Sequence, residues 1–505
     1  MAKVIMVQGT ASNAGKSVLV AGLCRIFKQD GYKVAPFKSQ NMALNSFITK
    51  DGFEMGRAQV MQAEACGIEP DVRMNPVLLK PTSDCGSQVI LNGKPIGNQT
   101  AKEYWGNKSK LKPFIKQTFE SLANDYDIIV IEGAGSPAEI NLKHDDIVNM
   151  GMAEMADAPV ILVGDIDRGG VFASLYGTVK LLNQNEQDRI CGLVINKFRG
   201  DIEILRSGLD MLEDLTNKHV LGVVPYAPLD IDDEDSLSDR LTTSNNVNLI
   251  NISVIRLPHI SNFTDFDPLS RINGVGLNYV TRPDQLANAD LIIIAGSKST
   301  IDDLKWLRES GLEAQILKCH ANGIAVFGVC GGYQMMGEHI SDPENTECGG
   351  DINGMGLLPV KTVFKSNKTT AQSTGEILNI DGIFSSLSGK HSIGYEIHMG
   401  ETTLCDNAKP FQTIKRAETT VFDGCYYNNA YGTYLHGIFD NSDIALTIVN
   451  ALASKKGISL ENENINLDEY KQIQYDKLAD IVRSSLDMDK IYSIMEEFSC
   501  NKTKD

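Results

Sequence analysis

Short, nearly continuous apolar runs alternate with amphipathic stretches through the first 225 residues of the chain. The apolar runs lie at residues 4–7, 34–37, 128–131, 160–163, 193–195 and 221–224. Runs of Val, Ile and Leu of this length are typical of strands buried on both faces of a parallel sheet. Residues 18–29 and 202–215 instead have helical spacing. The pattern predicts a doubly wound α/β domain over residues 1–225.

The βα pattern is interrupted once and then restarts. Residues 226–248 are rich in Asp, Glu, Ser, Thr and Asn, which predicts a solvated acidic linker. Apolar runs resume at residues 249–255, 291–295 and 325–329, and glycine-rich β segments follow to about residue 439. We expect a second α/β domain over residues 249–445. Apolar residues at helical spacing then predict a C-terminal helical segment over residues 446–505.

Composition narrows the classes of function. The 505 residues carry 47 Lys and Arg against 65 Asp and Glu, a net charge of −18. An acidic chain without a basic run is a poor candidate for a nucleic-acid binder. No apolar stretch approaches the ~20 residues that a membrane helix needs, so we expect no membrane partner either. The ten cysteines form no CxxC pair, which favours reduced thiols in a cytoplasmic protein. The oligomeric state stays open, with a homo-oligomer among the alternatives.

A glycine-framed loop follows the first predicted strand and opens a helix. It reads Gly-Thr-Ala-Ser-Asn-Ala-Gly-Lys-Ser, with one residue more between its glycines than the usual phosphate-binding loop has. Glycines let backbone N–H groups approach phosphate oxygens, and the helix N-terminus adds a positive end. The lysine would reach the β- and γ-phosphates, and the serine hydroxyl would hold Mg²⁺. We expect ATP to contact Gly9, Thr10, Asn13, Ala14, Gly15, Lys16 and Ser17.

Acidic and amide side chains at the ends of other predicted strands would complete this site. Glu132 and Asp165 follow two of the strands, where ligands bind in such sheets, and they would join Ser17 as metal ligands. The alternative is that either carboxylate caps a turn. Asn196, after another strand, is predicted to contact the nucleotide base, with an ordinary strand-end turn equally compatible.

The segment after the second predicted strand is polar. It begins at Lys38 and includes Gln40 and Asn41. One cation beside amides and hydroxyls at a strand end suits a polar ligand, so we expect Lys38 to contact nucleotide and the two amides to contact substrate. Spacing alone is equally compatible with a polar loop.

A second motif predicts a cysteine nucleophile. Cys330 stands between Gly328 and Gly331-Gly332, after one apolar run and before a helical stretch. Small neighbours permit the strained turn that pushes a nucleophile out of a sheet, and a helix N-terminus favours the thiolate. We expect the N–H groups of Gly331, Gly296 and Ser297 to hold an oxyanion.

A thiolate nucleophile needs a proton acceptor, and histidine is the usual one. His436 follows a predicted strand in Tyr-Gly-Thr-Tyr-Leu-His-Gly, 106 residues after Cys330. His398, in a segment of alternating polarity, is the competing candidate.

These motifs resemble two families of enzymes in one chain. The cysteine turn and His436 resemble class I glutamine amidotransferases, which are flavodoxin-like α/β domains, and GTASNAGKS resembles the dethiobiotin synthetase type of P-loop domain. Their combination is similar to the cobalamin-pathway amidotransferases. PFKSQNMALNS, GDIDRGGVFAS, INKFRGD, AGSKSTIDDL, GVCGGYQMMG, GYEIHMG and YGTYLHGIFD resemble in particular the cobyric acid synthase family.

This resemblance implies an ATP- and Mg²⁺-dependent ligase that takes nitrogen from L-glutamine. Its corrinoid substrate would be adenosylcobyrinic acid a,c-diamide, whose b, d, e and g carboxylates become amides through acyl phosphates to give adenosylcobyric acid. The resemblance also implies that the third triad member is missing, since Ile438 stands where most class I domains have Glu. We therefore expect a backbone carbonyl to orient His436.

Three alternatives remain open from the sequence. One is the paralogue that amidates the a and c side chains, and another is an amidoligase acting on a different carboxylate, such as one of the cell wall. The third is a P-loop switch ATPase without amidation activity, which would not need Cys330 and His436.

Overall fold

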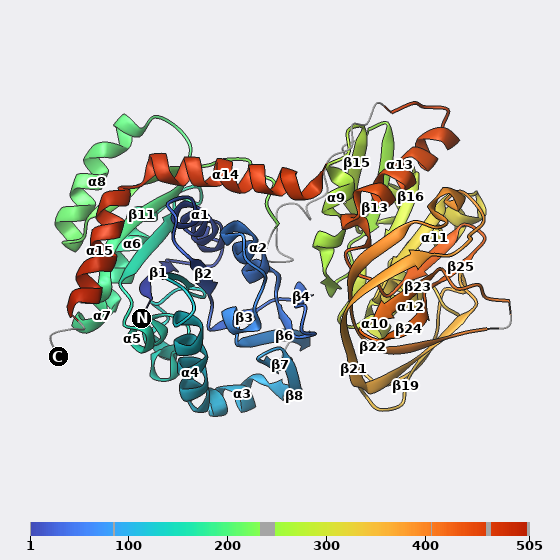
Figure 1. The fold of residues 1–505 in the computed structure, drawn as a ribbon, viewed down its shortest axis with the longest axis horizontal. Helices are drawn as coiled ribbons and strands as arrows, with labels where there is room; N and C mark the ends of the chain where they lie inside the picture. Colours follow the sequence, from blue (N-terminus) through green and yellow to red (C-terminus); the bar gives the residue numbers. More distant parts are fainter. Residues whose placement is uncertain (1, 84–85, 233–247, 406, 461–465, 502–505) are drawn as a thin grey trace.

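The protein consists of two α/β halves that lie side by side (Figure 1). The computed structural model describes residues 2–83, 86–232, 248–405, 407–460 and 466–501. Each half is built around a sheet of six strands. Among the residues described, no helix is long and apolar enough to cross a membrane.

The sheet of the N-terminal half is parallel throughout, in the order β12-β11-β10-β1-β9-β2. All six predicted apolar runs lie in strands of this sheet. In β10, for example, residues 160–163 are all buried, because both faces of the sheet are covered. The strands are β1 (Lys3–Gly9), β2 (Val34–Phe37), β9 (Ile128–Glu132), β10 (Val160–Asp165), β11 (Ile190–Phe198) and β12 (Val220–Pro225).

Successive residues of the central strands belong to two separate apolar cores. Met6 and Ile131 pack in one core, whereas Ile5, Val7 and Val130 pack in the other. This alternation follows from the period of two in a strand, and it confirms the predicted doubly wound fold. The helices of this half are α1 (Lys16–Gln29), α2 (Arg57–Cys66), α3 (Ala101–Asn107), α4 (Lys112–Ala123), α5 (Met150–Ala156), α6 (Val171–Leu181), α7 (Gln184–Arg189) and α8 (Ile202–Thr216).

A small β layer of the N-terminal half faces the other half (Figure 1). It contains a four-stranded sheet in the order β3-β6-β7-β8 and the pair β4–β5. These strands are β3 (Gln40–Met42), β4 (Ser46–Ile48), β5 (Glu54–Gly56), β6 (Val77–Ser83), β7 (Gly86–Leu91) and β8 (Lys94–Thr100).

The C-terminal half combines a mostly parallel sheet, β15-β13-β16-β18-β26-β25, with a second sheet, β20-β19-β21-β23-β24, on which β22 pairs with β21. Its strands are β13 (Ile250–Ile255), β14 (Ile260–Ser261), β15 (Val275–Val280), β16 (Leu291–Ile294), β17 (Gly296–Ser297), β18 (Ala325–Val329), β19 (His339–Asp342), β20 (Gly350–Asn353), β21 (Val360–Ile377), β22 (His391–Leu404), β23 (Gln412–Arg416), β24 (Thr419–Asp423), β25 (Cys425–Tyr427) and β26 (Ala430–Thr433). Its helices are α9 (Asp267–Ser270), α10 (Thr300–Glu309), α11 (Leu312–Ala321), α12 (Gly331–Met335) and α13 (Ser442–Lys455).

The last two helices return to the N-terminal half. α14 (Leu467–Ser485) runs from the C-terminal half back across the molecule, and α15 (Met488–Asn501) continues beside β1 (Figure 1). Leu478 and Val482 of α14 and Ile491 of α15 are buried in the same apolar core as Ile5 and Leu19. The boundary predicted at residue 445 falls inside α13, which packs on the C-terminal core.

The predicted acidic linker lies partly outside the described residues, since its residues 233–247 are not among them. In the described part Tyr226 and Pro228 are exposed, but the prediction of a solvated segment is wrong for Asp232. Asp232 is buried and bonds Arg57 of α2 at 2.8 Å, and Asp230 bonds Arg271 at 2.8 Å. These acidic side chains therefore hold the two halves together, because each one neutralises a buried or half-buried arginine.

A nucleotide loop and a buried thiol in two halves

The glycine-framed loop joins β1 to α1, as predicted, and two of its residues have positive φ angles. Gly15 precedes the helix with φ 89°, and Asn13 has φ 60°, so both adopt the left-handed region. The Lys16 ammonium donates to the carbonyls of Ala11 at 3.0 Å and Gly135 at 3.3 Å. The Lys16 side chain therefore lies over the loop and close to Gly9. A Cβ on Gly9 would lie 3.0 Å from Lys16 Nζ.

Ser17 and Glu132 meet at the carboxyl edge of the sheet. The Ser17 hydroxyl donates to Glu132 Oε1 at 2.9 Å, and Lys38 reaches the same oxygen at 2.9 Å. Gln62 of α2 donates to the other carboxylate oxygen at 2.5 Å. The structure thus brings together Ser17, Glu132 and Lys38, which sequence reasoning placed in one site.

This donor set fits a magnesium ion. A hydroxyl and a carboxylate are the hard oxygen ligands that Mg²⁺ prefers, and Mg²⁺ usually takes only one or two protein ligands beside phosphates and waters. The described residues contain no cluster of three or more His, Cys, Asp or Glu side chains that could hold a metal ion.

Asp165 and Asn196 brace the loop. Lys197 bridges Asp165, at 2.9 Å, and the carbonyl of Asn13, at 2.7 Å. The Asn196 amide donates to the carbonyl of Ala14 at 2.9 Å. The Thr10 N–H donates to Val163 at 2.9 Å, which ties the loop to β10. Asp165 accepts from Lys197 and from the Asp167 N–H, whereas the Ser17 hydroxyl bonds Glu132.

The amides predicted to contact substrate have partners within the protein. Gln40 accepts from the Tyr104 hydroxyl at 2.6 Å, and Asn41 is buried and donates to Gln59 at 2.9 Å. Gln40 remains half-buried at the start of β3, so of the two it is the one nearer to solvent.

The predicted cysteine turn is present between β18 and α12. Cys330 has φ 53° and ψ −109°, a conformation that is strained for a side chain with a Cβ. Its neighbours must be glycines, since a Cβ on Gly332 would lie 2.0 Å from the carbonyl oxygen of Ile294. A Cβ on Gly331 would lie 2.8 Å from the Ser297 nitrogen. The backbone of β17, with Gly296 and Ser297, therefore packs directly against the turn that carries the thiol.

His436 lies beside this thiol, buried and held by a carboxylate. Asp265, on the short 3₁₀ turn η5 (Phe263–Phe266), lies 2.6 Å from its Nδ1. The expectation that a backbone carbonyl orients His436 is wrong, because an aspartate earlier in the chain does so. Burial alone would lower the pKa of His436, but the charges of Asp265 and Cys330 raise the pKa to about 10. The imidazolium form is therefore favoured next to the sulfur.

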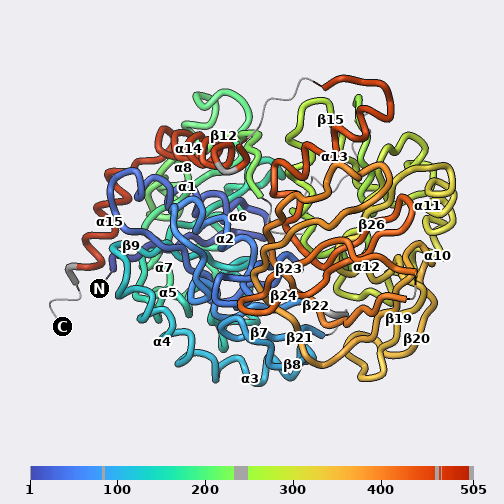
Figure 2. The backbone as a smooth tube through the Cα atoms, turned by 45° about the vertical axis from the view of Figure 1, so that its right-hand side comes forward, coloured from blue at the N-terminus to red at the C-terminus, as the bar shows by residue number. Residues whose placement is uncertain are grey.

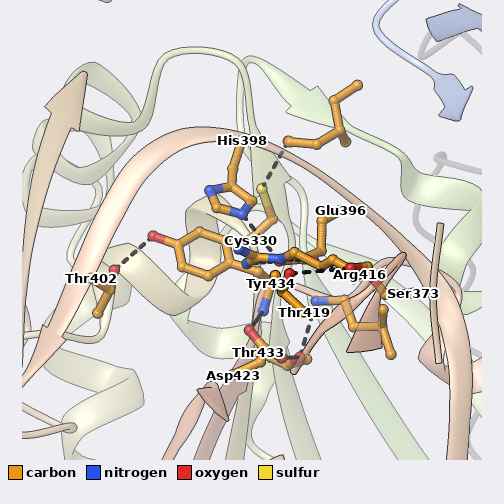
Figure 3. Close-up of polar contacts among 12 residues, drawn as sticks. Cys330, Ser373, Glu396, His398, Thr402, Arg416, Thr419, Asp423, Thr433 and Tyr434 are labelled. Atoms are coloured by element: carbon orange, nitrogen blue, oxygen red, sulfur yellow. Dashed lines mark hydrogen bonds and ion pairs between the residues drawn. The ribbon is translucent and has the colours of Figure 1, made fainter. Parts of the chain in front are cut away.

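The competing histidine, His398, is also close to Cys330 but is differently engaged (Figure 3). Its Nδ1 lies 2.8 Å from the Gly400 carbonyl, and its Nε2 lies 3.3 Å from Glu396, which Arg416 also binds at 2.6 Å. The ring stacks on Tyr434 with a centroid distance of 3.8 Å. Both nitrogens of His398 face oxygen acceptors, which favours His436 as the histidine that exchanges a proton with the thiol and the substrate.

A cavity of about 50 Å³ adjoins the thiol, and residues of both halves line it. Lys80, of β6, comes from the N-terminal half, while Lys298, Glu347 and Lys368 come from the C-terminal half. Lys80 and Lys368 bind the two oxygens of the fully buried Glu54, at 3.0 and 2.6 Å. Burial raises the pKa of Glu347 to about 7, and burial with two neighbouring lysines lowers that of Lys298 to about 7. The cavity is thus lined by both charge signs.

Sequence reasoning missed Asp265, Lys80 and Tyr395, which stacks on His436 with a centroid distance of 5.4 Å. Spacing could not link them to Cys330, because their elements lie far away in the sequence. One signal was available for Asp265, since it lies between Phe263 and Phe266, and a carboxylate in an apolar frame needs a buried partner.

Comparison with known proteins assigns both halves. Residues 5–237 match the family model described as the CobQ/CobB/MinD/ParA nucleotide binding domain, and residues 251–444 match the CobB/CobQ-like glutamine amidotransferase domain. A curated protein of Ruminiclostridium cellulolyticum named cobyric acid synthase is 58% identical over 98% of both chains. Another of that name, from Lachnoclostridium phytofermentans, is 56% identical over 98% of this chain and 100% of its own.

Solved structures are more distant. PurLQS from Thermotoga maritima aligns with 41% of this chain and 100% of its own, at 19% identity and a TM-score of 0.33.

Proposed function

The chain belongs to the cobyric acid synthase family, and from that premise we propose that it amidates the b, d, e and g carboxylates of adenosylcobyrinic acid a,c-diamide. As a member, it is an ATP-dependent amidating ligase with a glutamine amidotransferase domain. The observation that carries the proposal is the presence in one chain of a phosphate loop with Lys16 and of a thiol beside His436.

The N-terminal site would activate the carboxylate. A carboxylate oxygen of the corrinoid attacks the γ-phosphorus of ATP, and ADP leaves, so that an acyl phosphate forms. Lys16 and the loop amides stabilise negative charge on the phosphoryl oxygens, which is the main task in this chemistry. Ser17 and Glu132 would hold Mg²⁺, which when bound neutralises further phosphate charge.

The C-terminal site would release nitrogen. The Cys330 thiolate attacks the glutamine side-chain carbonyl, and the N–H groups of Gly331 and β17 stabilise the oxyanion. His436 then gives its Nε2 proton to the departing ammonia, while Asp265 keeps the ring oriented through Nδ1. Water hydrolyses the thioester to glutamate. Ammonia attacks the acyl phosphate, and inorganic phosphate leaves as the amide forms.

The lining of the small cavity supports glutamine as the nitrogen donor. An amino acid carries an ammonium and a carboxylate on its α-carbon, and Glu347 and Lys298 offer the opposite charges beside the thiol. We propose that these two side chains recognise the α-substituents of glutamine.

Mass spectrometry of the product tests the proposed function. With ATP, glutamine and the a,c-diamide, we expect the mass change of four carboxyl-to-amide conversions. Amidation of cobyrinic acid at only two positions would indicate the paralogous diamide synthase instead. ATP hydrolysis that is independent of both corrinoid and glutamine would indicate a switch ATPase. If the corrinoid stays unchanged and a different carboxylate compound is amidated, the protein is a different ligase.

A further inference from the structure

A short segment of the N-terminal half reaches the turn that carries Asp265. Asn45 Oδ1 accepts from the Phe263 N–H at 3.1 Å. The Ser46 N–H donates to Asn262 Oδ1 at 3.3 Å, and Asn262 Nδ2 donates back to the Ser46 carbonyl at 3.2 Å. β4, which begins at Ser46, lies at the border between the halves in Figure 1, and Figure 2 shows the two halves pressed together from another side. All of these groups are buried, so the contact excludes water.

These contacts fix the start of the 3₁₀ turn. Asn262 has φ 51°, and its carbonyl accepts from the Asp265 N–H at 3.1 Å. Asn262 and Phe263 are thus held by Asn45 and Ser46 from outside the domain, and Asp265 follows them in the same turn. A shift of this segment would move the carboxylate that lies 2.6 Å from His436.

Tyr395 forms a second route from the same segment to the histidine. Its hydroxyl donates to the Ser46 carbonyl at 3.1 Å and accepts from Asn262 at 2.9 Å. Its backbone pairs with that of His436 through two hydrogen bonds of 3.1 and 2.8 Å, and its ring stacks on the imidazole with an interplanar angle of 17°. Phe47 packs edge-on against the Tyr395 ring, with centroids 5.1 Å apart.

We propose that Asn45 and Ser46 of the nucleotide half, acting through Asn262 and Tyr395, position the Asp265–His436 pair. Asn45 and Tyr395 are then positioning residues for glutamine hydrolysis, and the glutaminase site is complete only when the two halves are docked. This inference rests on the proposed function in that Cys330 and His436 hydrolyse glutamine. It adds that the geometry of their site is set by the half that binds nucleotide.

Tyr395→Phe tests the inference, because it removes the hydroxyl and keeps the stacked ring. Tyr426→Phe is the matched control, since Tyr426 is also buried and donates to a carbonyl, that of Asn379 at 3.2 Å, but it lies on β25 of the other sheet of the C-terminal half. Glutamate release from glutamine is measured directly on the full chain. We expect kcat to fall about 10- to 100-fold in Tyr395→Phe and in Asn45→Ala, with little change in KM, as for a misplaced catalytic group.

The pH profile distinguishes positioning from loss of structure. Among the described residues, the groups that face His436 are Asp265 on η5, Cys330 on the turn between β18 and α12, and Tyr395 on β22. Displacement of Asp265 removes a cause of the raised pKa, so the limb of the glutaminase profile that reports His436 should move to lower pH in both variants but not in Tyr426→Phe. Amidation with supplied ammonia should equal that of the wild type.

The outcomes separate the inference from the function on which it rests. If kcat and the pH profile of Tyr395→Phe and Asn45→Ala match those of Tyr426→Phe, the positioning role is overturned. If one variant unfolds, as judged by its melting temperature, the other alone decides. If the wild type hydrolyses glutamine but amidates no corrinoid, the proposed function fails while the positioning test remains valid.

Discussion

The two sites of this protein are built in different ways. The phosphate cradle of the nucleotide site is local, because one loop of consecutive residues supplies its backbone, although Lys16 also bonds the Gly135 carbonyl and Glu132 joins Ser17 from another strand. The thiol site contains Asp265, Cys330 and His436, which come from three distant parts of the C-terminal half. Lys80 of the other half also lines its cavity. Backbone amides of one helix N-terminus suffice for a phosphate, whereas a buried nucleophile needs several side chains that converge from different elements.

The largest effects are expected when each of the two sites is inactivated separately. Cys330→Ala should lower glutamine-dependent amidation by roughly 10⁴- to 10⁶-fold, because the nucleophile is lost. Amidation with supplied ammonia should remain at the wild-type rate, measured by mass spectrometry of the corrinoid. Lys16→Ala should instead abolish amidation from either nitrogen source. Loss of both activities in Cys330→Ala would mean that the two sites are not separable.

Removal of the histidine's carboxylate partner should have the next largest effect. Asp265→Asn retains the size of the side chain but no longer fixes the ring or stabilises its cation, so glutaminase kcat should fall by roughly 10²- to 10⁴-fold. A steady-state assay of glutamate release checks this. Asp267→Asn, two residues along the same buried stretch, is the control. Equal losses in the two variants would contradict a specific role for Asp265.

Charge in the small cavity should affect binding more than turnover. Lys298→Met should raise the KM for glutamine about 10- to 100-fold, because the binding free energy of a charge-assisted hydrogen bond is lost. The kcat should change less. Lys305→Met is the control, since Lys305 is exposed on α10 and pairs with Asp302, three residues earlier, at 2.8 Å. Because burial and two neighbouring lysines lower the pKa of Lys298 to about 7, the wild-type KM should also rise above that pH. An unchanged KM in Lys298→Met would exclude this role.

The smallest effect concerns stability. The pKa of His436 is raised from 6.5 to about 10 in the folded protein, so the folded state binds a proton more tightly than the unfolded chain does. The resulting stabilisation is fully present below pH 6.5 and is lost as pH rises through about 10. Urea unfolding should therefore show a steeper loss of stability between these values in the wild type than in Asp265→Asn. Parallel pH dependences would contradict the raised pKa.

Much of the fold followed from the sequence because its signals are local. The apolar runs at residues 34–37 and 325–329 coincide with β2 and β18, since strands buried on both faces need continuous Val, Ile, Leu or Phe. The glycines around Cys330 likewise predicted the strained turn, because the close contacts of Gly328 and Gly332 leave no room for a side chain.

The remainder depends on tertiary contacts that no spacing encodes. Asp265 meets His436 across 171 positions of the chain, and Lys80 meets the thiol pocket through the docking of the two halves. The acidic residues around Asp232 predicted that it is solvated, yet it is buried in an ion pair with Arg57. Long-range ion pairs of this kind become visible only when the packing of the elements is known.

The return of α14 and α15 to the N-terminal half has a consequence for biosynthesis. The apolar face formed by Ile5 and Leu19 leaves the ribosome long before Leu478 and Ile491, which cover it in the folded protein. During elongation that face lacks its final cover, although the strands around it are already made. This face must be kept from aggregating until α14 and α15 have been made, so maturation of the ATP-binding module follows synthesis of the C-terminal half.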